Sequence, residues 1–90
     1  MMKAIVTVLG KDTVGIIAAI CALLSQHNVN VLDISQTILQ DYFTMVMMVD
    51  LSDCASSFAD LAADLEAAGA ERNLSIRIQR EDIFNAMHRI

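Results

Sequence analysis

The side chains best suited to catalysis are few in this 90-residue sequence, and they stand far apart. Neither histidine, His27 or His88, lies near a nucleophile motif such as G-x-S-x-G, so we interpret both as structural or solvated. Cys21 falls on the apolar stripe of an expected helix, and Cys54 has no cationic neighbour in the sequence that would favour a reactive thiolate. We therefore expect no enzyme activity. A small enzyme using Cys54 or His88 is the least favoured alternative.

Two groups of side chains could bind metal ions, but an ordinary role suits each group better. Alternate methionines share one face of a strand and the intervening one takes the other face, so three thioethers would not converge on a soft metal. Carboxylates spaced along a helix usually face the solvent. The cysteines match no zinc-ligand spacing. We expect no metal site and no cofactor. The candidate ligands are Met45, Met47, Met48, Asp60, Asp64 and Glu66.

The remaining chemistry is binding, and it is centred on the segment GKDTVGI, residues 10–16. A helix-like run begins near Val14, which places Gly15 in the first turn, where glycine costs about 1 kcal/mol relative to alanine. Helix starts bind carboxylates or phosphates through free N–H groups, and Asp12 or Thr13 could cap them. Gly15 would let a ligand approach the backbone. It could equally serve close packing of the helix on a sheet, and the spacing alone leaves both readings open.

Composition excludes several classes of partner. Net charge is −5, and the six basic residues are scattered, which argues against direct nucleic-acid binding. No apolar stretch approaches the roughly 18 residues needed to span a bilayer, and the first residues do not resemble a signal peptide. Two cysteines fit a reducing, cytoplasmic setting. The apolar fraction, 56%, exceeds the usual range of about 45–50% and suggests apolar surface used for a partner or for self-association.

The hydrophobic pattern predicts six main elements and a short final helix. Their order, strand-helix-strand-strand-helix-strand, is that of a ferredoxin-like βαββαβ sandwich, an α+β fold in which one four-stranded antiparallel sheet carries both helices on one face. We expect residues 1–80 to form this domain and residues 81–90 to form a helical extension docked on it. The expected strands are 3–9, 30–39, 42–51 and 73–80, and the expected helices are 14–27 (ending at Asn28), 58–68 (ending at Gly69) and 81–90.

The pattern also separates central strands from edge strands. The first and third strands are apolar on both faces, as central strands are, whereas the second and fourth alternate. In the second strand Leu32, Ile34 and Ile38 would lie on one buried face. The sheet face away from the helices would expose Ile, Val or Met from the central strands, and such a patch usually marks an interaction surface.

Two motifs resemble those of a known family. D-T-V-G-I, residues 12–16, resembles the D-x-P-G-[IVL] start of the first helix in ACT domains, with Val14 where proline is common. H-N-V-N-V-L-D-I-S-Q, residues 27–36, is similar to the N-I-x-x-x-S-Q second strand of that family, and F-T-M at 43–45 also matches. The resemblance covers about residues 3–80. It is closest to small stand-alone ACT proteins and to the ACT modules of the glycine-cleavage repressor and of formyltetrahydrofolate deformylase.

The resemblance implies a regulatory module that binds a small molecule, an amino acid above all, at the interface of a homodimer or higher homo-oligomer. The family's site joins the loop after the first strand to the start of the partner's second strand. It also implies an output through dimerisation or through a metabolic or regulatory protein partner. The alternative is a pure protein-interaction module without a small ligand, and edge-to-edge and face-to-face dimers both stay open. Carried over, the loop residues are Lys11, Asp12, Thr13, Val14, Gly15 and Ile16, and the strand residues are Asn30, Val31, Asp33 and Ile34.

Overall fold

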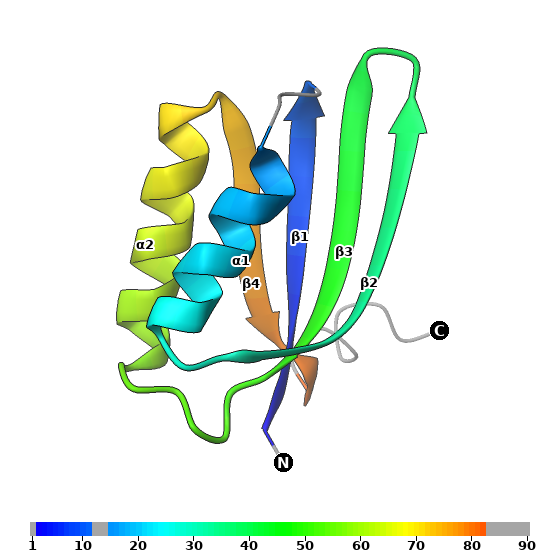
Figure 1. Ribbon diagram of the computed structural model, residues 1–90. Helices are drawn as coiled ribbons and strands as arrows, with labels where there is room; N and C mark the ends of the chain where they lie inside the picture. The colour runs from blue at the N-terminus through cyan, green and yellow to red at the C-terminus, as the bar shows by residue number, and fades with distance from the viewer. Residues whose placement is uncertain (1, 12–14, 83–90) are drawn as a thin grey trace.

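The computed structural model describes residues 2–11 and 15–82, and it has the expected ferredoxin-like βαββαβ architecture. Figure 1 shows a single sheet with both helices on one of its faces. Within the described residues neither helix is long and apolar enough to cross a membrane. The elements are β1 (Lys3–Lys11), α1 (Ile16–Gln26), β2 (Asn30–Leu39), β3 (Tyr42–Asp50), α2 (Phe58–Glu71) and β4 (Leu74–Arg80).

The sheet has the strand order β2-β3-β1-β4, and every neighbouring pair is antiparallel. The prediction of central and edge strands is therefore confirmed: β1 and β3 lie inside, β2 and β4 at the edges. The register places Val6 opposite both Met47 and Ile78, so these three side chains share the face beneath the helices. Each is at most 9% exposed. The core is thus the layer between this face and the buried stripes of α1 and α2.

Both helices differ from their expected limits at a glycine. α1 begins at Ile16, and Gly15 is its N-cap in the left-handed conformation, not a residue of the first turn. α2 does not stop at Gly69 but continues to Glu71, and Asn73, with φ of 57°, takes the left-handed position after it. Gly69 is buried against β4, where a Cβ would lie 2.8 Å from the carbonyl oxygen of Leu74. This glycine serves close approach of the helix to the sheet.

The expected end of α1 is correct. Asn28 follows the helix with φ of 60°, a conformation that asparagine tolerates. Its side-chain amide donates a hydrogen bond to the carbonyl oxygen of Asp53 at 2.9 Å. The end of α1 is therefore attached to the loop that precedes α2.

Strand β2 contradicts the expectation of a half-buried strand, because all ten of its residues are exposed. The helices lie over the β1 and β4 side of the sheet, and β2 extends beyond them at the far edge (Figure 1). Alternation places Ile34 and Ile38 on one face correctly, but at the bulge Leu32 has no opposite residue and Val31 lies opposite Val49. Burial also needs a covering element. Within one described chain no element covers β2.

The sheet face away from the helices matches the expectation only in part. Val46, from β3, is 42% exposed, and Leu9, from β1, is 55% exposed. Met48 is partly buried, and Ile5 is only 7% exposed. Exposed apolar side chains on this face are therefore fewer than the central strands suggested.

Asp50, at the end of β3, gives the fold a measurable acid dependence. The hydroxyl and the backbone N–H of Ser52 donate hydrogen bonds to its carboxylate at 2.6 and 3.0 Å, and these bonds lower the pKa of Asp50. A pKa lowered by folding stabilises the protein above the unfolded pKa, and this contribution is lost as the pH falls through the folded pKa. We expect Asp50→Asn to lower the melting temperature at pH 7 and to change it less at pH 3. Asp41→Asn, in the β2–β3 turn, is the control, and an equal loss for Asp50→Asn at both pH values would contradict the prediction.

Candidate functional site

The loop half of the expected site lies where β1 ends and α1 begins. Lys11 is the last residue of β1 and is exposed, and Ile16 is the first of α1 and is buried. Gly15 stands between them. The other expected loop residues, 12–14, lie outside the described residues.

The backbone conformation explains Gly15. Its φ of 84° and ψ of 7° lie in the left-handed region, which side chains with a Cβ rarely adopt. No described atom lies within 4 Å of the place where a Cβ would stand, so close packing of helix on sheet is not the reason for this glycine. Among the described residues the space beside it is open, as ligand access would require.

The N-cap position of α1 falls to Gly15, and among the described residues no side chain caps the helix there. The expected capping residues, Asp12 and Thr13, lie outside the described residues. The first turn also carries no acidic residue. Its N–H groups therefore meet no carboxylate of their own helix, which leaves the positive end of the helix dipole available to an anion.

The strand half of the site lies at the start of β2 and is fully exposed. Asn30 stands opposite Asp50, and the register shifts at a bulge between Val31 and Asp33. The carboxylate of Asp33 accepts a hydrogen bond from the N–H of Ile34 at 2.9 Å, which holds this side chain beside its own backbone. The bulge and this bond give the first residues of β2 a local shape unlike the rest of the strand.

Within one chain the two halves do not meet. Asn30 lies opposite Asp50, which lies opposite Lys3 at the start of β1, whereas Lys11 stands at the other end of that strand. The nine residues of β1 separate the two ends by roughly 26 Å, at about 3.3 Å per residue. Figure 1 shows the end of β1 and the start of α1 at one end of the sheet and the start of β2 at the other. A site made from both halves therefore needs a second chain.

A polar cluster that the sequence analysis did not identify joins α1 to α2. The carboxylate of Asp64 accepts a hydrogen bond from His27 Nε2 at 2.7 Å, and Nδ1 of the same ring is hydrogen-bonded to the hydroxyl of Ser56 at 2.5 Å. That hydroxyl lies 3.8 Å from the thiol of Cys54. The spacing of these residues matches no motif, so only tertiary contact could show the cluster.

The cluster has the acid–imidazole–hydroxyl order of a hydrolytic triad, but its contacts are those of a structural junction. The N–H of Ala55 donates a hydrogen bond to the carbonyl oxygen of His27 at 2.8 Å, so backbone and side-chain bonds both attach the loop to the end of α1. The side chain of His27 is only 14% exposed. None of these residues lines the two surface hollows that lie between α2 and β4. We interpret His27 as structural, in agreement with the sequence analysis.

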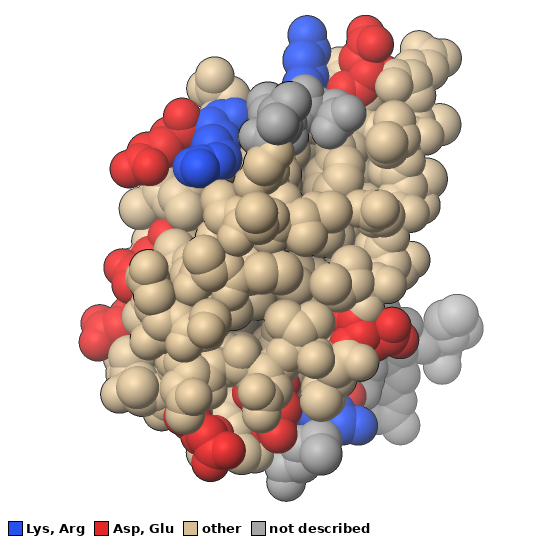
Figure 2. Space-filling view, in the orientation of Figure 1, with Lys and Arg blue, Asp and Glu red and all other residues tan. Residues whose placement is uncertain are grey.

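Charge is distributed very differently on the two helices. No residue of α1 is charged, whereas α2 carries four acids and no base. Figure 2 shows this contrast, with acidic side chains along the α2 side and an uncharged area in the middle of the same face. The uncharged area continues onto β2, whose exposed apolar side chains share this side of the sheet. We call the set the α1–β2 surface, and its members are Ile17, Val31, Ile34 and Ile38.

Comparison with known proteins agrees with the observed fold. Residues 3–79 match the ACT domain family. A UPF0237 protein of Bifidobacterium longum is 57% identical over 90 residues, which is 100% of both chains. An ACT domain protein from Streptococcus pneumoniae is 44% identical, with a TM-score of 0.80 over 92% of this chain and 93% of that chain.

Two more distant structures show the fold alone. A putative glycine cleavage system transcriptional repressor is 21% identical, with a TM-score of 0.74 over 88% of this chain and 45% of that chain. A formyltetrahydrofolate deformylase from Burkholderia mallei is 16% identical, with a TM-score of 0.79 over 89% of this chain and 28% of that chain.

Fold and family together define a small ferredoxin-like domain of regulatory type. The chain belongs to the ACT domain family, and the resemblance seen in the DTVGI and NVNVLDISQ segments is confirmed. ACT domains are usually regulatory and bind ligands.

Proposed function

We propose that this protein is a homodimeric regulatory module that binds an amino acid between two chains. The observation that carries the proposal is the position of β2. It is an exposed edge strand. Its first residues lie at the end of the sheet opposite Gly15 of the same chain, but in a dimer they would lie beside Gly15 of the partner.

The edge of β2 is built to be paired. A long, apolar edge strand invites association, and monomeric proteins usually protect such an edge with lysine, proline or a covering element. β2 has ten exposed residues, no proline and no lysine, and Asp33 is its only charged residue. The bulge near Leu32 interrupts only its first residues. Pairing with a second copy would give the unpaired backbone N–H and C=O groups of this edge hydrogen-bond partners.

The charge distribution favours the same interface. Two copies that meet through β2 bring α1 toward α1, and neither helix carries a charge. The α1–β2 surface would then be buried in the dimer. This interface would account for part of the high apolar fraction of the sequence, because it would bury the four exposed apolar side chains of the α1–β2 surface and the uncharged helix.

Antiparallel pairing of two β2 strands would assemble the site. In a symmetric dimer the same edge serves both chains, so the start of one strand lies beside the end of the other. With the symmetry axis at the middle of β2, Asn30 of the partner subunit would face Leu39. Leu39 is opposite Tyr42, which is opposite Lys11. The partner's strand half thereby arrives at the end of the sheet that holds Gly15.

The chemistry of both halves suits an amino acid. The N–H groups at the start of α1 would hold its carboxylate, and the left-handed Gly15 leaves the approach open. Asp33 or Asn30 of the partner subunit would meet the ammonium group or the side chain. The proposal includes a cytoplasmic location, which two free cysteines suit, and residues 81–90 as a helical extension on a 1–80 domain.

A thermal-shift screen tests the ligand claim. An amino acid at 100 times its dissociation constant should add about 2.7 kcal/mol of stability, which raises the melting temperature by several degrees in a domain of this size. Gly15→Asn should keep the fold, because asparagine tolerates a positive φ, but its side chain would occupy the approach and abolish the shift. Ser25→Asn, on the last turn of α1, is the matched control. No shift with any amino acid, nucleotide or organic acid would remove the ligand from the proposal.

The second candidate is a protein-interaction module without a small ligand. The exposed α1–β2 surface favours it, since this surface could receive a partner whether or not a ligand binds. Under this alternative Gly15→Asn would leave association unchanged and no compound would shift the melting temperature.

A further inference from the structure

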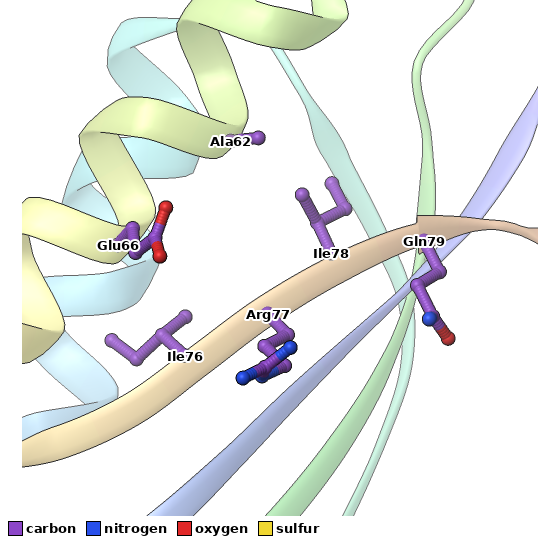
Figure 3. Close-up of a pocket in the computed structure, with 6 residues that line it drawn as sticks. All are labelled: Ala62, Glu66, Ile76, Arg77, Ile78 and Gln79. Atoms are coloured by element: carbon purple, nitrogen blue, oxygen red, sulfur yellow. The ribbon is translucent and has the colours of Figure 1, made fainter.

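Ile5 of β1 is buried on the sheet face away from the helices. It lies between Met48 of β3 and Gln79 of β4, and it is only 7% exposed. Figure 3 shows Gln79 directed away from α2, whereas Ile76 and Ile78 point toward it. Directly opposite residues of an antiparallel sheet share a face, so Ile5 and Met48 lie on the same side as Gln79. We call these three residues the outer patch.

The strands around Ile5 do not account for its burial. Val46 also has a strand on each side, and it is 42% exposed on the same face. Leu9, farther along β1, is 55% exposed. Met48 and Gln79 would be exposed if their own side chains were the outermost cover of Ile5, but both are partly buried. Both described helices lie on the opposite face (Figure 1), so neither of them covers the outer patch.

The described part of the chain ends beside this patch. Arg80, the last residue of β4, lies opposite Ala4, and Glu81 and Asp82 are helical. Eight residues, 83–90, follow in the sequence. A helix of eight residues spans about 12 Å, and the distance from β4 across β1 to β3 is about 10 Å. The segment is therefore long enough to cross the outer patch from the end of β4.

The sequence of this segment offers an apolar side to the sheet. At helical spacing Ile83, Phe84, Met87 and Ile90 fall on one side, and Asn85 falls on the other. A stripe of this kind is buried in a stable protein, because exposed apolar side chains gain free energy when they leave water.

We propose that residues 83–90 continue the helix begun at the end of β4 and pack across the outer patch of their own chain through Phe84 and Met87. The inference rests on the helical extension of the proposed function and assigns its docking surface, but it does not depend on the ligand. The docked segment also takes the patch that a face-to-face dimer would use, which leaves the edge of β2 for a second copy.

The same chain is a better occupant than a second copy. The segment is attached at the end of β4, within a few residues of the patch, and a short connection gives an effective concentration in the millimolar range. A separate copy reaches such a concentration only in very concentrated solution.

Nuclear Overhauser effects (NOEs) in the full chain test the inference. We expect NOEs between the methyl groups of Ile5 and the ring protons of Phe84. In a mixture of isotope-labelled and unlabelled protein, a filtered spectrum records only NOEs between two chains, and the contact should be absent from it. An Ile5–Phe84 NOE in the filtered spectrum would make a second copy the occupant and overturn the inference.

A matched pair of variants tests the packing. Phe84→Ala should shift the methyl resonances of Ile5 and Met48 and expose them to a soluble paramagnetic agent, whereas Asn85→Ala should leave them unchanged. The methyl resonances of Ile34, on the α1–β2 surface, should not respond to either variant. Equal responses to the two variants, or none, would contradict the proposed contact.

The Cα chemical shifts of residues 83–90 separate the two levels of the proposal. Helical shifts without an NOE to Ile5 would overturn the docking and leave the helical extension in place. Random-coil shifts would overturn both, while the dimer and ligand claims would still be decided by their own measurements.

Discussion

Ile34→Lys is expected to convert the proposed dimer to a monomer, whereas Val46→Lys is expected to leave it intact. The two positions are closely matched. Ile34 is 41% exposed and Val46 42% exposed, and both lie on strands of the same hairpin. They differ in the side of the sheet: Ile34 belongs to the α1–β2 surface, and Val46 lies on the face away from the helices.

The effect of Ile34→Lys should be large because a symmetric interface contains each substitution twice. Two ammonium groups would be brought into an apolar contact, where like charges cost several kcal/mol. We expect the dissociation constant of the dimer to rise at least about a hundredfold, which corresponds to about 2.8 kcal/mol. Sedimentation equilibrium over a range of protein concentrations measures it.

The same pair of variants separates the two dimer geometries. If Val46→Lys dissociates the protein and Ile34→Lys does not, the chains meet face to face and the site proposed here is not assembled. A wild-type protein that stays monomeric at high concentration would exclude both geometries. Circular dichroism of each variant serves as the check on folding.

Gly69→Ala is expected to destabilise the protein by about 1–3 kcal/mol, although alanine is the better helix former. In an exposed helix alanine exceeds glycine by about 1 kcal/mol. At this position a Cβ would lie 2.8 Å from the carbonyl oxygen of Leu74 and 3.0 Å from Cγ1 of Ile76. The first contact is to backbone, which cannot rotate away, so α2 must move off β4 and the overpacking cost exceeds the propensity gain.

Urea unfolding of Gly69→Ala and of Ala67→Gly measures this reversal. Ala67 is exposed on the same turn of α2, so its replacement by glycine should cost only the propensity difference of about 1 kcal/mol. Both variants should therefore be less stable than the wild type, although they exchange the same two residues in opposite directions. A stabilised Gly69→Ala protein would show that the contact with β4 relaxes without cost.

The order of elements could be read from the sequence because it depends on local patterns. Alternation and helical spacing are properties of neighbouring residues, and they predicted all four strands and both main helices in order. The difference between central and edge strands was also readable, since the first and third strands carry apolar residues on both faces whereas the second and fourth alternate. The motifs around Gly15 and Asn30 identified the family for the same reason.

The roles of Gly15 and Gly69 could be assigned only from the structure. From the sequence Gly15 looked like an exception inside a helix and Gly69 like a helix end. The structure gives Gly15 a left-handed φ at the N-cap and makes Gly69 a contact point between α2 and β4. A glycine in the sequence indicates that a side chain would be unfavourable at that position, but it does not give the cause. For Gly15 the cause is the backbone angle φ, and for Gly69 it is contact with Leu74.

Burial and the polar junction likewise depended on contacts between distant segments. The sequence by itself determined which side of β2 is apolar, but the helices leave that side uncovered, so its exposure is a property of the assembled sheet. His27, Ser56 and Asp64 meet because α1 ends beside the start of α2, a fact that no spacing records. Local pattern specifies which surfaces are apolar or charged, and packing alone determines which of them is left for a partner.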